Sequence, residues 1–289
     1  MAEPPGRTGS APGAAVSGDV ASTMCTCPTP FTDTTFTDTT SRRDRRRDRM
    51  DAVNVPLVLV AHGSRDEAAH TCVGEIADAV GAVLPDVPVR VGYVDVRAPT
   101  VADAVARLGR AGPGGAVVVP AFLAAGYHVR TDLPAQLAAC GADPARFVVT
   151  PALGPDPLLA RATYRRLAEA GWCYGDAVVL AAAGSSDPAA LAQVRAAGRM
   201  LAAEVGRKVR VGFVATAAPQ VEAVVAALRR SGERRIAVAS WLLASGVFHA
   251  RLTSAGADVV AAPLGAHPDV VAAIVARYES GARTLDPAA

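Results

Sequence analysis

Residues 92–101 read GYVDVRAPTV, and residues 212–221 read GFVATAAPQV, the same pattern 120 residues further along the chain. Other landmarks keep almost the same spacing: LAAG at 123–126 matches LASG at 243–246, and the Gly-Ser pair at 63–64 matches the one at 184–185. PALG at 151–154 likewise corresponds to APLG at 262–265. A unit that recurs across most of a chain indicates duplication, so the sequence predicts two lobes built on one plan.

Short Val-rich runs alternate in each copy with Ala-rich stretches of helical period. This alternation is typical of βαβ units and predicts a small parallel sheet flanked by helices in each lobe. Helix starts are expected at Thr100, which follows Pro99, and at Asp132, which precedes Pro134. The expected strands are 57–61, 89–94, 116–121 and 147–150 in the first copy and 177–180, 209–214, 236–239 and 258–261 in the second.

The first 54 residues differ in composition from the rest of the chain. Residues 1–49 are rich in Gly, Pro, Ser, Thr, Asp and Arg and offer almost nothing to bury, so we expect a disordered tail over residues 1–54. The arginine-rich run at 42–49 is interpreted as a solvated tail rather than a nucleic-acid or membrane tether, and Met50 is an alternative start. The predicted fold is therefore α/β with this tail, a site-bearing lobe at 55–172 and a degenerate lobe at 173–284.

Composition excludes several function classes. Aromatic residues make up only 4% of the chain and the formal net charge is +2, which disfavours nucleic-acid binding. The longest apolar runs are too short to cross a bilayer. The five cysteines, Cys25 and Cys27 in the tail included, are an odd number without CxxC spacing, so neither a disulfide framework nor a zinc knuckle is predicted. We expect a soluble cytoplasmic protein.

Polar side chains follow three of the strands expected in the first lobe. His62 comes directly after the first strand, Asp95 after the second, and His128 lies in the loop after the third. The carboxyl ends of parallel strands open on one edge of a sheet, where ligands gather. Two imidazoles and a carboxylate can hold a divalent ion such as iron, cobalt, nickel or zinc and leave coordination positions free. The sequence therefore predicts an open metal site there.

The second copy provides an internal control for this site. Its equivalent positions are Ala183, Ala215 and Phe248. Residues that served packing alone would keep similar types in both copies, so the joint loss of all three indicates one shared function in the first lobe. His249, beside Phe248, is a candidate contributor to the cleft from the second lobe. His70 and His267 lack such company and are interpreted as structural or surface residues.

Arg65, Arg97 and Arg130 follow the three candidate ligands closely along the chain. Arginine binds carboxylates through paired hydrogen bonds, so the three are candidates for a rim that holds a polycarboxylated ligand, although solvated surface arginines would give the same pattern. Gly63 and Ser64 precede a helix and are expected to offer N–H groups to an anion. Neither GxGxxG nor GxxxxGK[ST] follows the first strand and no GxSxG is present, which argues against nucleotide sites and a hydrolase elbow.

Three motifs carry a family resemblance: VAHGSRD at 60–66, GYVD at 92–95 with Pro99, and VPAFL at 119–123 with Gly126 and His128. Together they resemble the CbiX/SirB-type sirohydrochlorin chelatases, and the second half is similar to the degenerate C-terminal copy of the long, two-lobed members. The resemblance extends over residues 55–134 at the level of motifs. It implies a chelatase-like fold with the site in the first lobe.

The resemblance also implies a reaction, the insertion of Co²⁺ or Fe²⁺ into sirohydrochlorin on the route to cobalamin or sirohaem. His62 and His128 match the family's metal-binding, proton-accepting histidines. Asp95 matches an acidic position that is more often Glu, and its shorter side chain favours a water-bridged or electrostatic role. The metal is then a substrate and no permanent cofactor is expected. The expected partners are the tetrapyrrole and the ion, with neither nucleic acid nor membrane, in a monomer or a homodimer.

Two rival interpretations remain open at this point. A carrier of metal or tetrapyrrole would use the same cleft without turnover. A small-molecule binding protein would clamp its ligand between the lobes, with the histidines incidental. The ligand types do not distinguish cobalt from iron.

Overall fold

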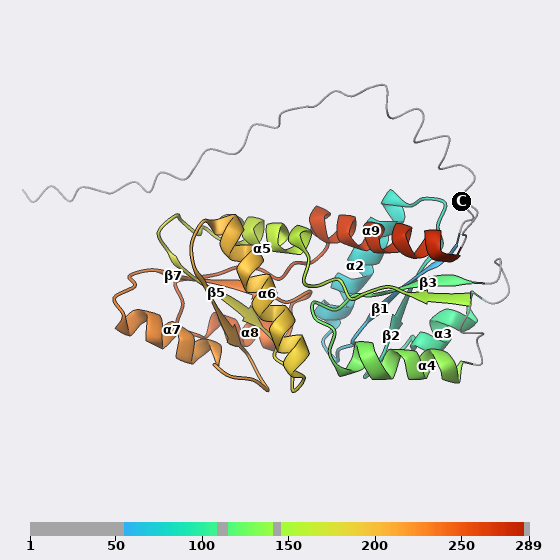
Figure 1. Ribbon diagram of the computed structural model, residues 1–289, viewed down its shortest axis with the longest axis horizontal. Helices are drawn as coiled ribbons and strands as arrows, with labels where there is room; N and C mark the ends of the chain where they lie inside the picture. The colour runs from blue at the N-terminus through green and yellow to red at the C-terminus, as the bar shows by residue number, and fades with distance from the viewer. Residues whose placement is uncertain (1–54, 109–114, 141–145, 286–289) are drawn as a thin grey trace, which may run out of the picture. The chain divides into compact units, whose positions relative to one another are not determined.

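Two four-stranded parallel sheets organise the chain, one in each copy of the repeat (Figure 1). The computed structural model describes residues 55–108, 115–140 and 146–285, which belong to one compact unit of the chain. The tail predicted for residues 1–54, with Cys25, Cys27 and Met50, lies outside the described residues.

The sheet of the N-terminal lobe has the strand order β2-β1-β3-β4. Its central strand β1 reads LVLVA and is buried along its whole length, as is typical of a parallel strand covered by helices on both faces. The ends of the first three strands agree with the predicted ends to within one residue. The strands are β1 (Leu57–Ala61), β2 (Val89–Tyr93), β3 (Ala116–Pro120) and β4 (Phe147–Val149).

The C-terminal lobe repeats this plan with the order β6-β5-β7-β8. Its strands are β5 (Ala177–Ala182), β6 (Val209–Phe213), β7 (Ile236–Trp241) and β8 (Val259–Val260). The two lobes thus confirm the predicted duplication strand by strand.

Several helices begin at polar caps. Asp66 accepts a hydrogen bond from the Ala68 N–H group ahead of α2, and Asp187 does the same for Ala189 ahead of α6. Thr100 and Asp103 form a capping box, which confirms the predicted helix start after Pro99. No helix within the described ranges is long and apolar enough to cross a membrane. The helices are α2 (Glu67–Val83), α3 (Val101–Ala106), η1 (His128–Asp132), α4 (Leu133–Ala139), α5 (Pro157–Glu169), α6 (Pro188–Val205), α7 (Val221–Arg230), α8 (Val247–Thr253) and α9 (Pro268–Leu285).

The helices that follow the two sheets exchange places. α5 packs against α6 and β7 of the C-terminal lobe, whereas α9 returns to pack on α2, β3 and β4 of the N-terminal lobe (Figure 1). Tyr278 of α9 donates a hydrogen bond of 2.8 Å to the Val55 carbonyl, and Gly281 lies so close to Val117 that a Cβ atom would come within 2.6 Å of it. The expected boundary between residues 172 and 173 therefore divides the sheets but not the helices that cover them.

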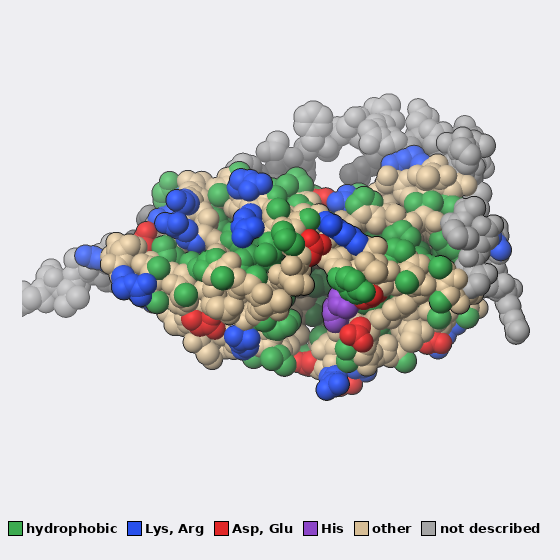
Figure 2. Space-filling model, turned by 60° about the horizontal axis from the view of Figure 1, so that its bottom comes forward, with side chains coloured by type: hydrophobic (Ala, Val, Ile, Leu, Met, Phe, Trp, Pro, Cys, Tyr) green, Lys and Arg blue, Asp and Glu red, His purple; other side chains and the backbone are tan. Residues whose placement is uncertain are grey.

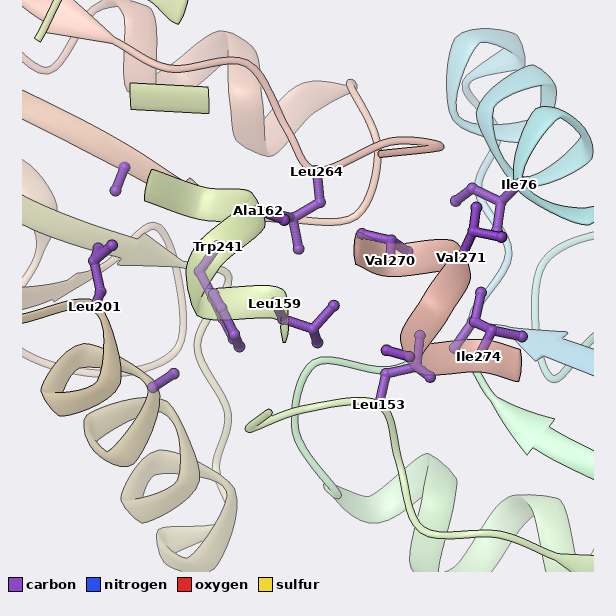
Figure 3. Close-up of a cluster of buried hydrophobic side chains, with 14 of the residues drawn as sticks. Ile76, Leu153, Leu159, Ala162, Leu201, Trp241, Leu264, Val270, Val271 and Ile274 are labelled. Carbon is purple, nitrogen blue, oxygen red and sulfur yellow. The ribbon is translucent and has the colours of Figure 1, made fainter. Parts of the chain in front are cut away.

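This exchange makes one hydrophobic core continuous through both lobes. Leu159 and Ala162 of α5 belong to the same buried cluster as Val270 and Ile274 of α9 (Figure 3). Ile76 joins it from the N-terminal lobe and Trp241 from the C-terminal lobe. The two lobes are thus held together by burial of apolar surface, the main favourable term in folding.

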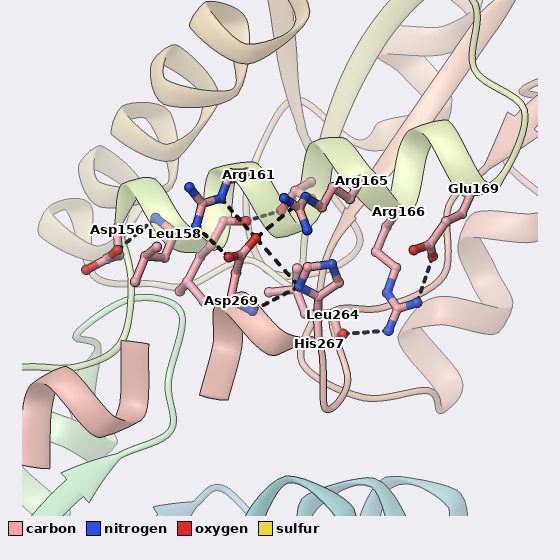
Figure 4. A network of polar contacts seen from close by, with 11 residues as sticks. Asp156, Leu158, Arg161, Arg165, Arg166, Glu169, Leu264, His267 and Asp269 are labelled. Atoms are coloured by element: carbon pink, nitrogen blue, oxygen red, sulfur yellow. Dashed lines mark hydrogen bonds and ion pairs between the residues drawn. The ribbon is translucent and has the colours of Figure 1, made fainter. Parts of the chain in front are cut away.

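Arginines tie the exchanged helices down in a crosswise pattern. Arg166 of α5 donates to the Leu264 carbonyl at 3.0 Å (Figure 4), and Arg277 of α9 donates to the Leu153 carbonyl at 3.5 Å. The repeated motifs at 151–154 and 262–265 are therefore the places where the chain crosses between lobes. Arg161 adds a bidentate pair of 2.6 and 3.1 Å with Asp269, which is nearly buried.

Candidate functional site

The ends of β1 and β2 are locked together by their backbones. The Asp95 N–H group donates a hydrogen bond of 3.0 Å to the His62 carbonyl. Gly63 follows with a φ of +98°, and a Cβ atom there would lie 2.0 Å from the Asp95 carbonyl oxygen. Only glycine combines this backbone conformation with this close approach. Gly63 is therefore needed to form the strand-end turn that presents His62.

His62 and His128 meet through their Nε2 atoms, which lie 3.1 Å apart. Their rings stand edge to face at an angle of 79°, with centroids 4.4 Å apart. Nitrogens at this separation, each about 2.0–2.1 Å from one ion, would subtend about 100° at the ion. That angle suits two neighbouring positions of an octahedral or tetrahedral site. A single ion could therefore bind both imidazoles.

Asp132 is the second partner of His128. Its Oδ2 atom lies 2.5 Å from the Nδ1 atom of His128, and both side chains are about one-third exposed. The sequence pattern predicts a helix start at Asp132, and α4 does begin at the next residue, but the Asp132 side chain makes no capping bond. The sequence does contain one feature that could have predicted this contact. His128 and Asp132 are four residues apart, and side chains at this spacing meet on a helix.

Asp95 does not join the two histidines. Its Oδ1 atom accepts a hydrogen bond of 2.7 Å from the Val96 N–H group, and its exposed side chain is absent from the lining of the cleft described below. Among the described residues, no three His, Cys, Asp or Glu side chains form a group that could hold a metal ion. The geometry thus provides two convergent side chains where the strand-end pattern predicts three.

The two histidines lie on a cleft of about 660 Å³ between the lobes. Figure 2 shows this hollow, with histidine at its edge. Ser64, Phe122 and Tyr127 line it from the N-terminal lobe, and Phe248 and His249 line it from the C-terminal lobe. Strand-end loops of both lobes therefore form its walls.

Two bonds between lobes hold the loop that leads to His128. The Ala125 N–H group donates to Gln193 Oε1 at 2.6 Å, and the Trp241 indole N–H group donates to the Leu123 carbonyl at 3.3 Å. Since Gln193 and Trp241 both belong to the C-terminal lobe, this lobe helps to fix the loop although it carries no imidazole pair of its own.

The expected arginine rim is only partly available. Arg97 pairs with Glu67 at 3.0 Å, and Arg130 pairs across the lobes with Asp187 at 3.4 Å. Arg65 is exposed and makes no ion pair with any described residue. None of the three arginines is among the described residues that line the cleft. Of the three, Arg65 alone keeps its charge uncommitted for a ligand.

Ser64 and His249 line the cleft, as the sequence predicts, but both are partly engaged. The Ser64 hydroxyl accepts a hydrogen bond from the Asp66 N–H group at 3.0 Å, and Asp66 itself caps α2. The helix N-terminus is thus already occupied by a carboxylate rather than open to an anion. The Nε2 atom of His249 lies 3.2 Å from the Ala261 carbonyl, which holds this ring against its own lobe.

His70, which is half-buried, and His267, which is buried, do not line the cleft. His70 bonds to the Tyr93 hydroxyl through Nδ1 at 2.6 Å, and burial raises the pKa of that phenol. His267 is buried at the start of α9, where burial lowers its pKa despite the opposing effect of Asp269. Both fit the structural role expected for them.

The C-terminal lobe repeats the backbone of the site without its chemistry. The Ala215 N–H group donates to the Ala183 carbonyl at 2.9 Å, and Gly184 has a φ of +103°, as at the equivalent positions of the first lobe. Phe248 stands where His128 stands, and Leu252 stands where Asp132 stands. The strand-end geometry therefore belongs to the fold, whereas the imidazoles and the carboxylate belong to one lobe.

Together, these features define a class of protein: a duplicated α/β chain with two lobes over a common cleft and an imidazole pair in the first lobe. The family model of CbiX matches residues 56–170 and again residues 177–281. The chain therefore belongs to the CbiX family, which confirms the resemblance carried by the three motifs.

Curated relatives match part of the chain. The sirohydrochlorin cobaltochelatase of Methanosarcina acetivorans is 30% identical over 123 residues, which are 39% of this chain and 95% of that protein. The enzyme of the same name from Methanopyrus kandleri is 40% identical over 83 residues, 29% of this chain and 58% of that protein. The chain thus spans a little over half of the length of the second relative and nearly all of the first.

Solved structures share the two-lobed fold. SirB from Bacillus subtilis with Fe³⁺ superposes with a TM-score of 0.72 at 20% identity and covers 81% of this chain and 97% of that chain. CbiX, described as the terminal enzyme for siroheme biosynthesis in denitrifying bacteria, superposes with a TM-score of 0.60 at 24% identity, over 78% of this chain and 98% of that chain. At these identities the superpositions confirm the predicted chelatase-like fold.

Proposed function

We propose that this protein is a sirohydrochlorin chelatase that inserts Co²⁺ or Fe²⁺ into the tetrapyrrole held in the interlobe cleft. The observation that carries the proposal is the 3.1 Å approach of the His62 and His128 Nε2 atoms at the wall of that cleft. Relatives named sirohydrochlorin cobaltochelatase support the substrate, and SirB structures with cobalt and with Fe³⁺ support the metals.

The imidazole pair gives the ion a temporary site. Hydrogen bonding between two Nε2 atoms requires a proton on one of them. When a divalent ion arrives, this proton moves through water to the Nδ1 atom of the same ring, and the freed Nε2 lone pair binds the ion. Imidazole suits borderline ions such as Co²⁺ and Fe²⁺. Because only two protein ligands converge, other positions of the ion stay open to water and then to the ring nitrogens. An ion held in this way is bound firmly enough to be delivered and loosely enough to leave.

Insertion also requires a base. Two pyrrole N–H protons leave the macrocycle as the metal enters, and histidine accepts protons near neutral pH. Once the ion has moved to the ring, the Nε2 lone pairs of His62 and His128 are free again and lie at the place where those protons are released. The same two atoms can therefore hold the metal first and take protons afterwards.

Exposed apolar side chains at the cleft suit a flat macrocycle. Tyr127, Val247 and Phe248 are 63%, 72% and 43% exposed, and all three line this cleft. Large apolar side chains gathered at one exposed place commonly mark a binding site. Phe248 lies in the lobe that lacks imidazoles, so one cleft wall carries the metal pair and the other offers an apolar face to the ring.

Arg65 is the best candidate to hold a carboxylate of the substrate, since Glu67 and Asp187 already engage Arg97 and Arg130. To bind the substrate, Arg97 and Arg130 would have to release the carboxylates of Glu67 and Asp187 and take a substrate carboxylate instead. Asp95, exposed at the same sheet edge, is proposed to attract the arriving cation without being its direct ligand.

A metal-insertion assay tests the proposal. Wild type, His62→Ala and His128→Ala are mixed with sirohydrochlorin and Co²⁺, Fe²⁺, Ni²⁺ or Zn²⁺, and the change in the tetrapyrrole absorption spectrum is followed over many turnovers. Each histidine variant is expected to lose about 100-fold or more in rate. The matched control is His70→Leu/Tyr93→Phe, which copies Leu191 and Phe213 from the second lobe and should retain near wild-type activity. Uptake that stops at one equivalent per chain would instead identify a carrier.

A further inference from the structure

Asp132 contacts His128 but does not line the cleft. We propose that Asp132 is a positioning residue that holds the proton of His128 on Nδ1 and turns the bare Nε2 atom toward His62 and the incoming ion. This inference rests on the proposed function, because it assigns to the metal site a residue that does not touch the metal.

The contact itself supports this role. The Asp132 carboxylate lies 2.5 Å from Nδ1, a short bond between groups that are about two-thirds shielded from water. An ionised carboxylate only accepts hydrogen bonds, so Nδ1 must be the donor. Nε2 of the neutral ring is then the acceptor in the contact with His62. A carboxylate behind an imidazole fixes both its tautomer and its orientation.

The local backbone is shaped around the pair. Residues 128–132 form a π-helical turn in which the Leu133 N–H group bonds to the His128 carbonyl. Such wide turns are rare in proteins overall, but those that occur are often found at functional sites. Leu133 is fully buried and anchors the end of the turn in the core. The corresponding segment of the second lobe, Val247–Thr253, is an ordinary α-helix.

The second lobe also argues against a purely structural role for the carboxylate. At the position of Asp132 it has Leu252, which is 1% exposed and packs in the core of that lobe. A helix in this place is therefore stable without an acidic side chain. The imidazole and the carboxylate are lost together, as expected if one serves the other.

The two histidines are supported unequally. Among the described residues, the Nδ1 atom of His62 has one hydrogen-bond contact, with the carbonyl of the adjacent Gly63 at 3.2 Å, and His62 is exposed. His128 is thus the oriented member of the pair, and Asp132 is the residue that orients it.

The experiment compares Asp132→Leu, Asp132→Asn and Asp132→Glu with wild type in the full chain. The first readout is the tautomer of His128 in the metal-free protein, from its ¹⁵N chemical shifts at mildly alkaline pH. Wild type should show the Nδ1–H form, and Asp132→Leu should shift toward Nε2–H. The second readout is titration with Co²⁺ alone, in which Asp132→Leu should bind about 10- to 100-fold more weakly. Asp132→Glu should recover part of this loss, and Asp132→Asn should lie between.

The controls separate this inference from the proposed function. Asp78→Asn removes an exposed carboxylate of α2 in the same lobe and should change neither readout. Thermal unfolding shows whether each variant is folded, and the isosteric Asp132→Asn keeps the test valid if Asp132→Leu does not fold. An unchanged His128 tautomer and unchanged Co²⁺ affinity in the folded Asp132 variants would overturn the role of Asp132. A wild type that binds Co²⁺ but inserts no metal would overturn the proposed function and leave this role in place.

Discussion

The two lobes share the backbone of their strand ends and differ in chemistry. Gly63 and the equivalent Gly184 both adopt positive φ. So do Val96 and its equivalent Thr216, which lie in the turns after β2 and β6. Conformations that are uncommon for a residue such as Val are thus retained in a lobe with no imidazole pair to position. The comparison teaches that the strand-end strain belongs to the fold, whereas the imidazole pair, the carboxylate and the π-helical turn at residues 128–132 belong to the first lobe.

The largest expected effect is the gain of a metal site. Ala183→His/Phe248→His/Leu252→Asp copies His62, His128 and Asp132 into the second lobe, where the Ala215–Ala183 backbone bond reproduces the strand ends. Equilibrium dialysis should then show a second Co²⁺ equivalent per chain, bound more weakly than the first because α8 lacks the π-helical turn. Ala183→His alone is the control and should add none. A folded triple variant with unchanged stoichiometry would show that the shared backbone is insufficient.

The next effect is on stability and should be equal in the two lobes. Gly63→Ala and Gly184→Ala would place Cβ atoms 2.0 and 1.9 Å from carbonyl oxygens at positive φ. Each should lower the free energy of unfolding in urea by about 2–4 kcal/mol, but only Gly63→Ala should also weaken Co²⁺ binding. Gly74→Ala, where nothing lies within 4 Å, should be neutral or slightly stabilising. Clearly unequal losses would contradict the equivalence of the turns.

A smaller effect concerns the apolar wall. Phe248→Ala should raise KM for sirohydrochlorin about 10-fold, since a partly exposed aromatic ring contributes roughly 1–2 kcal/mol of apolar contact, while kcat and Co²⁺ affinity remain unchanged. Steady-state kinetics measure this split. Tyr174→Ala removes an aromatic ring that is 72% exposed and does not line the cleft, and should leave KM unaltered. A fall in kcat at constant KM would place Phe248 in the chemical step instead.

The smallest expected effect is on the pH dependence of the free energy of unfolding, which should arise at the start of α9 and not at the start of α5. α9 begins at Pro268, between His267 and Asp269, whereas α5 begins at Pro157 after Asp156 and has no histidine there. Burial lowers the pKa of His267, so the unfolded chain binds a proton more readily and stability falls as the pH drops below about 6.5. Burial alone would raise the pKa of Asp269, but Arg161 and neighbouring charges lower it below 3.8, so its contribution is lost at still lower pH.

Urea unfolding between pH 7 and 5 tests this difference. His267→Asn should flatten the dependence of stability on pH by at most about 1.4 kcal/mol per pH unit, and Asp156→Asn should not alter the slope over this range. An unchanged slope in His267→Asn would show that another group titrates there.

Buried valine runs made the sheets predictable, because a continuous apolar segment after a turn leaves few alternatives to a central parallel strand. The exchange of α5 and α9 was not predictable in the same way. An amphipathic pattern such as that of Pro268–Leu285 shows which face is buried, but it does not say which sheet lies beneath that face. For this reason the sequence predicted a boundary between lobes at residues 172 and 173, with each helix assigned to the sheet that precedes it in the chain.

The site was predictable where the strands alone determine it. His62 and His128 converge because parallel strands end together. Asp95 follows a strand as well, but its side chain turns back onto Val96, and that direction depends on a turn whose φ no pattern reveals. Asp132 resembles a helix cap because Leu133 and Pro134 follow it, and Arg130 finds its acidic partner in the other lobe, out of reach of any local pattern.

The position of α9 has a consequence for synthesis on the ribosome. The sheet that presents the imidazole pair is built from strands within residues 57–149, yet the helix that closes one of its faces, α9, is translated only after the whole second sheet. Domains translated first generally fold first, but the lobe with the imidazole pair is complete only when residues 268–285 have been made. If the proposed function holds, competence to take up metal should emerge only after residues 268–285 have been translated.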